Sequence, residues 1–408
     1  MTPLFYIIIA FILIEFIISK YLDHLNDKTW SNQLPEELAN LYDAEKYAKA
    51  QEYDKEKGKL SNISSYLSLF LMLTMIIFGG FAWLNDWVIS ITDNAILQSL
   101  IFFGVLYVAT DIISLPFSYY GIFVIEEKYG FNKMTVKTYI ADKIKGYLMT
   151  AILGGGILAL ILWFYNTAGE YFWLYAWILV TTFSLFMTMF YTSIFVPIFN
   201  KLKPLEDGSL RQKIEDFAAK VNFPLNNISV IDGSKRSTKA NAYFSGIGAK
   251  KSIVLYDTLM KDHTDEELVG ILAHEVGHYK KKHIQKSMII SILHTGFMLF
   301  LIGKFVGSQA FAEALFVSEP NFHIGILVFG ILFTPISMVT GLLMNMFSRK
   351  NEFEADNFAK EHYGAQPLID SLKKLSVNHL SNLQPHPAYV FFHYSHPPLL
   401  ERLRNLMK

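Results

Sequence analysis

The chain has 408 residues, of which 52% are hydrophobic and 15% are aromatic, and its basic and acidic residues balance to a formal net charge of zero. Its apolar residues come in long runs, which indicates a membrane protein rather than a soluble domain, and the neutral charge gives no reason to expect a nucleic-acid partner. The absence of cysteine excludes disulfides, thiolate nucleophiles and cysteine metal ligands, and leaves His, Asp and Glu as ligands.

Several apolar runs reach the length of about 18 residues that a helix needs to cross a bilayer. Seven such runs lie near residues 3–19, 63–84, 96–118, 147–165, 172–199, 287–307 and 322–347. The first run has the position of a signal peptide, but no positive charge precedes it, Glu15 interrupts it and no small-residue cleavage site follows. We therefore interpret it as a membrane anchor. The fourth run contains the triplet Gly154-Gly155-Gly156 in its middle.

Lysine and arginine alternate between the segments that connect these runs, and this alternation predicts the orientation of the chain. Basic residues are frequent in the segment after the first run, after the third run, in 200–286 and from Arg349 onward, whereas 85–95 and 308–321 lack them. Because cytoplasmic loops carry the excess of basic residues, we expect the N-terminus outside and the C-terminus inside. The composition, rich in Lys, Asn and Ile, favours a bacterial inner membrane over the endoplasmic reticulum.

The segment 200–286 has the pattern of a small α+β domain on the cytoplasmic side. Residues 207–221 have helical periodicity, with Asp207 or Ser209 as the N-cap. Strands are predicted by β-branched runs at 226–232, 238–248 and 250–257, the second of these as an edge strand.

A helix predicted over 264–283 carries the pattern His-Glu-x-x-His, with Thr264 as its N-cap. Residues four apart share one helix face, so His274 and His278 can direct their imidazoles at one zinc ion. Glu275 lies one position round the helix, where it can take a proton from a water molecule on that ion. The alternative is a solvated helix with incidental histidines, because the five-residue pattern alone is suggestive rather than decisive.

A third ligand has to be His, Asp or Glu, and the segment 348–362 directly after the seventh run offers candidates. Glu352 and Asp356 lie four apart on one helix face, so one can bind zinc while the other accepts a hydrogen bond from a ligating histidine. Glu354 points elsewhere and is expected to be solvated, as is His283 beside three lysines. The alternative for the segment is an acidic surface turn.

The expected organisation has four parts: spans one to five over 1–199, a cytoplasmic zinc-protease segment over 200–286, spans six and seven over 287–347, and a cytoplasmic segment completing the zinc site over 348–408. Polar residues inside spans are costly in lipid and are expected to face protein or water. Three of them, Glu15, Asp111 and His294, interrupt the apolar runs. We interpret His294 as an interior residue rather than a ligand.

Ordered blocks along most of the chain carry a resemblance to a known family. They are LPFSYYGIFVIEEKYGFNK (115–133), VPIFNKLKPLEDG (196–208), ANAYFSG (240–246), KSIVLYDTLM (251–260), ILAHEVGHYKKKH (271–283), SRKNEFEADNFA (348–359) and HPPLLERLR (396–404). The chain thereby resembles the CAAX prenyl protease 1 family, integral-membrane zinc metalloproteases of the gluzincin type. The resemblance implies a fold of seven transmembrane helices enclosing a water-filled chamber, capped by the zinc domain.

The resemblance also implies a role for each matching metal-site position. His274, His278 and Glu352 would bind one zinc ion per chain, Glu275 would be the base, and Asp356 would orient a histidine.

Three further positions match the family pattern in the same way. Asn241 would hold the substrate backbone on an edge strand, His396 would line the site near the developing oxyanion, and Arg402 would lie near the third-ligand glutamate. The resemblance implies a membrane-embedded zinc endopeptidase that cleaves C-terminal or membrane-proximal peptide segments, prenylated CAAX peptides included, beside the lipid bilayer. General quality control of membrane proteins is the alternative enzymatic role. A seven-span transporter or receptor is the alternative outside enzymes, although the chain shows neither repeated halves nor matching broken helices.

Overall fold

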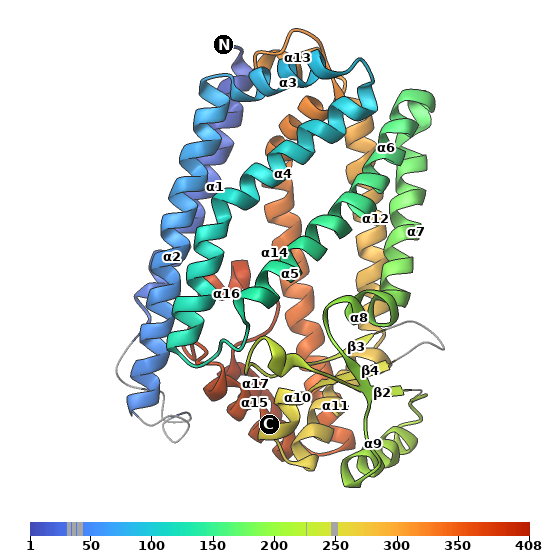
Figure 1. Cartoon of the computed structure of the whole chain (residues 1–408). Helices are drawn as coiled ribbons and strands as arrows, with labels where there is room; N and C mark the ends of the chain where they lie inside the picture. The colour runs from blue at the N-terminus through green and yellow to red at the C-terminus, as the bar shows by residue number, and fades with distance from the viewer. Residues whose placement is uncertain (31–33, 35–37, 39–43, 226, 246–251) are drawn as a thin grey trace.

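A computed structural model of the chain describes residues 1–30, 34, 38, 44–225, 227–245 and 252–408. The ends of the predicted strands at 226 and 246–251 therefore fall outside the described residues. The molecule is an elongated bundle of long helices with a small sheet and several short helices gathered at one end (Figure 1). We call this end, which carries β1–β4, the sheet end.

Within the described residues, seven helical segments are long and apolar enough to cross a membrane, which confirms the predicted number. They consist of α1 (Pro3–Asp27); α2 (Ala44–Ile77); α4 (Ala95–Tyr120) with η2 (Gly121–Glu126); α5 (Val136–Met149) with η3 (Thr150–Gly154) and α6 (Gly155–Thr167); η4 (Gly169–Tyr171) with α7 (Phe172–Phe190), η5 (Tyr191–Phe195) and α8 (Val196–Phe199); α12 (His283–Phe305); and α14 (Phe322–His362). Many of their large apolar side chains are exposed, among them Phe70, Trp163 and Leu293. Such exposure is expected of helices whose solvent is lipid.

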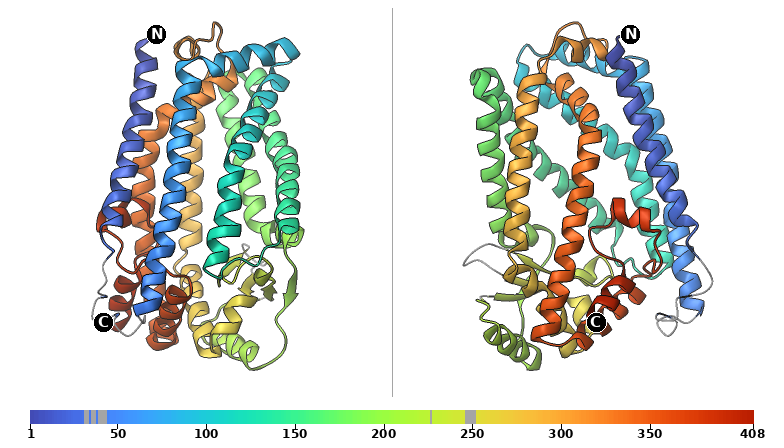
Figure 2. Two further views of the ribbon diagram at one scale, coloured as in Figure 1. Left: turned by 60° about the vertical axis from the view of Figure 1, so that its left-hand side comes forward. Right: turned by 180° about the vertical axis from the view of Figure 1, so that it is seen from behind.

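Glycines have different effects at two positions in the predicted spans. The second run was predicted to continue to residue 84, which is wrong, because α2 ends at Ile77 and Gly79 adopts a left-handed φ of 69°. The chain turns there into α3 (Gly80–Ile91), which lies across the end of the bundle opposite the sheet (Figures 1 and 2). The glycine triplet of the fourth run, in contrast, does not break the helix, which passes through the π-helical turn η3 into α6.

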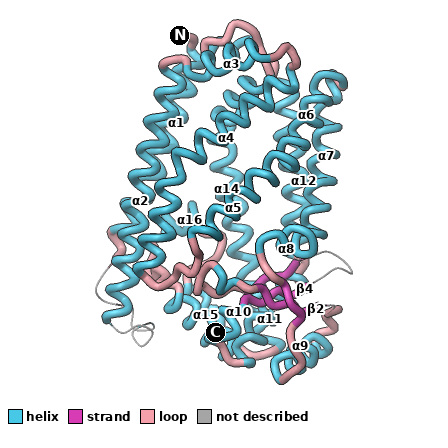
Figure 3. The backbone as a smooth tube through the Cα atoms, viewed as in Figure 1, coloured by secondary structure: helices cyan, strands magenta, loops and turns pink. Residues whose placement is uncertain are grey.

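In the described part of the chain the sheet, which is drawn in magenta in Figure 3, has four strands in the order β1-β2-β4-β3. They are β1 (Leu202–Pro204), β2 (Asn227–Ile231), β3 (Ala242–Ser245) and β4 (Ser252–Tyr256). The pair β2–β4 is parallel, while β1–β2 and β3–β4 are antiparallel. The position of β3 at one edge agrees with the edge strand predicted from the sequence, whereas β1 was not predicted.

Short helices complete the two ends of the molecule. They are η6 (Gly233–Lys235), α9 (Ser209–Lys220), α10 (Asp257–Asp262), α11 (Asp265–Lys280), α13 (Gln309–Ala314), α15 (Ala365–Asn378), α16 (Pro387–His393) and α17 (Leu399–Met407). The predicted N-cap of α9 is wrong, because Gly208 takes that position without a side-chain bond. The Ser209 hydroxyl instead donates to Asp265, at 2.7 Å, and so ties α9 to the start of α11.

One hydrophobic core at the sheet end joins segments that are far apart in sequence. It includes Leu255 of β4, Leu272 of α11, Ala359 at the end of α14 and Leu403 of α17, each at most 2% exposed. The contact between α11 and α14 depends on Gly277, since a Cβ atom there would lie 2.9 Å from the Ala355 Cα. This close approach sets the helix with the His-Glu-x-x-His pattern directly against the last turns of α14.

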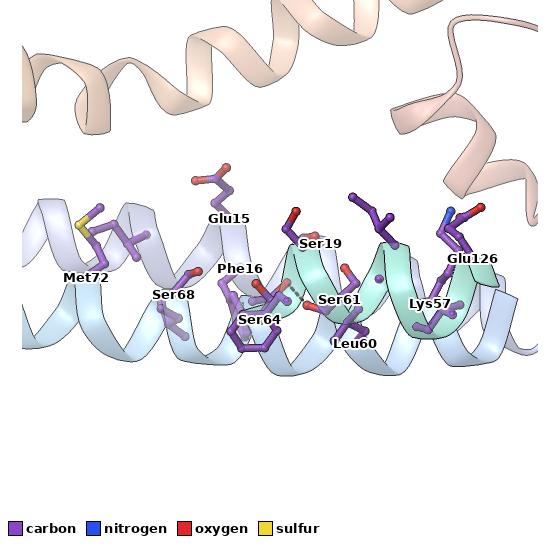
Figure 4. A pocket seen from close by; sticks show the side chains of 18 residues that line it. Glu15, Phe16, Ser19, Lys57, Leu60, Ser61, Ser64, Ser68, Met72 and Glu126 are labelled. Atoms are coloured by element: carbon purple, nitrogen blue, oxygen red, sulfur yellow. Dashed lines mark hydrogen bonds between the residues drawn. The ribbon is translucent and has the colours of Figure 1, made fainter. Parts of the chain in front are cut away.

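The structure also accounts for the polar residues inside the spans. Asp111 of α4 accepts hydrogen bonds from Lys143 and Tyr147 of α5, both at 2.5 Å, and so joins two neighbouring spans. His294 is half-buried beside the Phe333 ring of α14, with 6.1 Å between the ring centroids. Glu15 is exposed and lines a groove of about 780 Å³ between α1, α2 and η2 (Figure 4).

Candidate metal centre

Helix α11, which carries the His-Glu-x-x-His pattern, is held in place by hydrogen bonds at its start and by packing of its buried face. Thr264 and Glu267 form a reciprocal capping box, in which the Thr264 hydroxyl accepts from the Glu267 N–H at 3.3 Å and the Glu267 carboxylate accepts from the Thr264 N–H at 2.8 Å. Leu268, Leu272 and Val276 lie in the core at 1–2% exposure. The structure therefore confirms Thr264 as the N-cap and leaves the histidine face turned towards α14.

Three side chains direct donor atoms at one point. The Nε2 atoms of His274 and His278 are 3.1 Å apart, and Glu352 of α14 places its two carboxylate oxygens 3.4 Å from His274 Nε2 and 3.2 Å from His278 Nε2. One ligand atom from each residue lies within 4.8 Å of the others. The set combines residues from two helices that the sequence separates by a whole span, and it is a group able to hold a metal ion.

The residue behind His274 is Asp356, which is fully buried. Its Oδ1 lies 2.8 Å from His274 Nδ1, and its carboxylate also accepts two hydrogen bonds from the Arg402 guanidinium, at 2.9 and 2.6 Å. The His274 Nδ1–H therefore donates to Asp356, and this leaves Nε2 directed at Glu352. The sequence left open which carboxylate joins the donor group. The structure brings Glu352 into it and sets Asp356 behind a histidine.

The electrostatics of this group favour a positive charge. Burial and the Arg402 charge act to lower the pKa of His274, yet the hydrogen bond to Asp356 and the nearby Glu352 carboxylate outweigh them and raise it to about 9. The two carboxylates thus stabilise a cation here, whether it is a proton or a metal ion. The Oε2 atom of Glu352 is buried and accepts no hydrogen bond from any described residue. A divalent cation would satisfy that oxygen, so the residues present fit a metal ion.

His278 has a supporting chain of its own, which the sequence-based interpretation missed. Its Nδ1 lies 3.0 Å from His283 Nδ1, and His283 Nε2 lies 3.0 Å from a carboxylate oxygen of Glu354. Because His278 directs Nε2 at the site, its Nδ1–H donates to His283, and the His283 Nε2–H donates to Glu354.

The prediction that His283 is solvated is wrong, since its exposed fraction is 3%. The physical reason is that Lys282 adopts a left-handed φ of 60°, so that the chain reverses after α11 and the first residue of α12 points back at His278. Glu354 was also expected to be solvated, but its side chain is only about one-third exposed and is held by His283. No helical spacing signals this contact, because it crosses a turn.

Two residues of the C-terminal segment, His396 and Arg402, lie near Glu352. His396 Nε2 lies 3.3 Å from Glu352 Oε1, on a side chain that is 64% exposed, whereas the buried Arg402 places Nη1 3.7 Å from Glu352 Oε2. Glu275, the residue after His274, is half-buried, and its charge acts on Arg402. The exposed His396 is thus the side chain of this group with the most freedom to move towards a substrate.

Asn241 lies just before the edge strand β3. Its main-chain oxygen accepts from the Tyr256 N–H at 3.1 Å, and its side-chain oxygen accepts from the Ala242 N–H at 2.9 Å. The preceding residue, Ala240, donates its N–H to His379 Nε2 at 3.0 Å. Burial, with Lys239 and His263 nearby, lowers the pKa of His379 and keeps that nitrogen available as an acceptor. No motif or spacing pointed to His379, whose contact with Ala240 holds the chain that leads into β3.

Comparisons with known proteins agree with this combination of spans and metal-ligand side chains. Residues 24–201 match the family described as CAAX prenyl protease N-terminal, five membrane helices, and residues 204–408 match peptidase family M48. The chain is similar to CAAX prenyl protease 1 of Saccharomyces cerevisiae, with 35% identity over 98% of this chain and 94% of the yeast protein. It is 32% identical to the Homo sapiens CAAX prenyl protease 1 homolog, over 92% of this chain and 89% of the human protein. The crystal structure of S. mikatae Ste24p superposes with a TM-score of 0.92 at 36% identity, covering 100% of this chain and 99% of that one.

Proposed function

We propose a metal, a mechanism and a substrate class for this chain, which belongs to the CAAX prenyl protease family of M48 peptidases and is therefore a multi-pass membrane metalloprotease. The metal is zinc, held by His274, His278 and Glu352. Two imidazoles and one carboxylate form the protein ligand set of many catalytic zinc sites, in which a fourth position stays open. The observation that carries this assignment is the convergence of both Nε2 atoms on the buried carboxylate of Glu352.

The chemistry that follows is hydrolysis of a peptide bond. When bound, zinc supplies a Lewis acid that polarises the peptide carbonyl and lowers the pKa of a water molecule towards about 7. Glu275 takes a proton from the attacking water as the C–O bond forms, and it then passes this proton to the leaving nitrogen as the C–N bond breaks. His396, which approaches Glu352 on an exposed side chain, stabilises the negative charge that develops on the carbonyl oxygen. The buried Arg402 assists by holding Asp356 and Glu352 in position.

The substrate is an extended peptide that adds to the open edge of β3. Backbone hydrogen bonds to an edge strand give affinity without strict side-chain requirements, so sequence preference should be loose. Asn241 then holds the substrate backbone, and for this its side chain has to release the Ala242 N–H. We infer that the substrates are C-terminal or membrane-proximal segments, prenylated CAAX peptides included. This inference is supported by the names of the curated relatives and by a donor group that lies where α11 leads into α12 and where α14 ends.

We further infer that the bundle encloses an aqueous chamber and that the sheet end is cytoplasmic. The groove between α1, α2 and η2 supports the chamber, because serine hydroxyls and charged groups line it within the spans (Figure 4). Its polar residues are Glu15, Ser19, Lys57, Ser61, Ser64, Ser65, Ser68, Ser118 and Glu126. The alternation of basic loops supports the orientation, with the N-terminus outside in a bacterial inner membrane.

The orientation is testable because the chain contains no cysteine. A single cysteine at Asn94, between the second and third spans, should react with an impermeant thiol reagent added outside intact cells. A single cysteine at Lys213 of α9 should react only after the membrane is opened. The reverse labelling pattern would overturn the orientation and leave the catalytic proposal intact.

The substrate proposal is tested with matched peptides. A farnesylated C-a-a-X peptide and the same peptide without the isoprenoid are incubated with purified protein in detergent or liposomes, beside an unfolded membrane protein as the quality-control substrate. We expect cleavage of the farnesylated peptide, inhibition by 1,10-phenanthroline, and a fall of about 10²-fold or more in the Glu275→Gln variant with zinc retained. Glu319→Gln, on the connection before α14, is the control. Cleavage of the unfolded protein alone would favour quality control.

A further inference from the structure

The two faces of β3 meet very different surroundings. Ala242 and Phe244 point into the main core of the sheet end, the same core that contains α11. Tyr243 between them points to the opposite face, where it packs with Val196 and Val254. Because side chains alternate along a strand, any strand that pairs with β3 also divides its side chains between these two faces.

A pocket of about 590 Å³ lies on the Tyr243 face. Its walls come from the sheet and from the ends of α5 and α7 together with η5 and α8. Aromatic rings and methionines dominate the lining, namely Met149, Met187, Tyr191, Phe195, Phe199, Tyr243 and Tyr256. A volume of this size suits a group much larger than one amino-acid side chain, and methionine adapts its shape to apolar ligands.

The charged group in the pocket lining would not prevent an apolar group from binding there. Among the described residues that line the pocket, Arg236 carries a charge, and Asp142 neutralises it through two hydrogen bonds of 2.8 and 3.0 Å. Its remaining N–H groups reach the Phe199 carbonyl oxygen at 2.9 Å and the Asn200 side chain at 3.1 Å. An apolar group entering the pocket would therefore leave no buried charge without a partner.

The pocket opens where a substrate would bind. Asn241 directs its main-chain oxygen at Tyr256 of β4, so the alternation of an antiparallel ladder turns the N–H and C=O groups of Ala242 and Phe244 towards the open edge. A substrate strand would bond to these groups. The substrate residue directly opposite Tyr243 would then place its side chain on the Tyr243 face, and both Asn241 and Tyr243 line the pocket.

We propose that this pocket binds the isoprenoid of a prenylated substrate. The inference rests on the proposed function and deepens it, because it assigns the lipid to a place on the chain distinct from the metal centre. Backbone pairing along β3 would fix the peptide, and burial of the isoprenoid among the rings and methionines would supply affinity that an unmodified peptide lacks. The pocket lies between the sheet and the ends of two spans, so the lipid stays close to the depth from which a membrane-bound substrate arrives.

The test fills the pocket without touching the metal centre. Met187→Trp adds bulk to the pocket wall, and Met189→Trp makes the same change on the same helix at an exposed position outside the lining. We expect Met187→Trp to raise KM for a farnesylated peptide by about 10-fold or more, with a smaller effect on a geranylated peptide and none on the unmodified peptide. Met189→Trp should match the wild type with all three.

A second variant guards against a folding defect. Tyr191→Ala removes an exposed ring from the pocket rim and should also weaken binding of the farnesylated peptide, measured as Kd in a Glu275→Gln background where turnover is suppressed. Zinc content and thermal unfolding midpoint should stay at wild-type values in both variants. An unchanged KM in Met187→Trp, or an equal rise for prenylated and unmodified peptides, would overturn the pocket assignment while the proposed function stands. Failure of the wild type to cleave the farnesylated peptide would overturn both.

Discussion

Helix α14 contributes to one buried polar cluster near its start, around His323, and to another towards its end, around Glu352. The two clusters differ in how their hydrogen-bonding groups are paired. In the first turn, His323 is 1% exposed and has a hydrogen-bonding partner at each ring nitrogen, Ser99 at 3.1 Å and Asn85 at 2.9 Å. Asn321 completes this cluster by donating to the same Asn85 oxygen at 2.8 Å. At the far end, Glu352 and the imidazoles of His274 and His278 instead direct acceptor atoms at one another.

The difference distinguishes a structural polar cluster from a group of side chains able to hold a metal ion. In the His323 cluster the donors and acceptors are neutral and match in number. Their mutual hydrogen bonds therefore offset the cost of burying these polar groups, and no ion is needed. In the Glu352 cluster the hydrogen-bond donors sit behind the ligands, in Arg402, His283 and the ring N–H groups, and leave a buried carboxylate oxygen without a donor. A buried histidine by itself is therefore not evidence of a metal site. Buried acceptor atoms that converge on one point without a hydrogen-bond donor are such evidence.

The largest contrast between the two ends should come from removing one residue at each. Glu352→Ala deletes a ligand, so we expect loss of zinc and a fall in peptidase activity of at least about 10³-fold, since the metal supplies several kcal/mol of transition-state stabilisation. His323→Asn should keep one zinc per chain and most activity. Metal analysis of the purified proteins, with a peptide-cleavage assay, measures both. Retention of zinc in Glu352→Ala would remove the basis of the comparison.

A smaller effect is expected from the chain behind His278. Glu354→Ala leaves the His283 Nε2–H without its acceptor and frees His278 to turn, so zinc affinity should fall by about 10- to 100-fold. Glu354→Gln keeps a side-chain oxygen that accepts from His283, and it should restore most of the affinity. Competition with a chromophoric chelator measures the change independently of turnover.

The matched control for this effect is Lys350→Ala. Lys350 lies on the same helix, and its Nζ is 3.9 Å from Glu354 on an exposed surface, so its removal should leave zinc affinity within about twofold of the wild type, as expected for a weak surface ion pair. Equal loss of affinity in Glu354→Ala and Lys350→Ala would point to general electrostatics in place of a positioned histidine.

The smallest effect on chemistry belongs to the His323 cluster. Asn85→Leu removes the oxygen shared by His323 and Asn321, so the buried His323 Nε2–H loses its acceptor at a cost of about 1–3 kcal/mol, and the half-buried Asn321 amide loses an acceptor as well. We expect a lower thermal unfolding midpoint in detergent, with zinc content and KM unchanged. A loss of metal in this variant would mean that the two ends of α14 are coupled, contrary to the distinction drawn between them.

Sequence patterns were informative wherever a segment forms its hydrogen bonds within itself. The number of spans followed from hydropathy, because a helix in lipid has to meet all its backbone hydrogen bonds internally. The cap of α11 followed from Thr264 and Glu267, which bond to each other three residues apart. The cap of α9 did not follow, because Ser209 bonds to Asp265 on another helix. The end of α2 was missed as well, since it depends on the left-handed conformation of Gly79.

The sequence by itself determined that His274 and His278 lie together, since a spacing of four on one helix suffices to bring them to one face. Spacing could not separate Glu352 from Asp356, which share a face of α14 for the same reason. That choice was made by the packing of α11 against α14 at Gly277, which brings one carboxylate to the Nε2 atoms and the other to Nδ1 of His274. The environment of His283 likewise depends on a chain reversal at Lys282. Local periodicity describes neighbours along one element, whereas contacts between elements depend on turns and close approaches that only the folded chain contains.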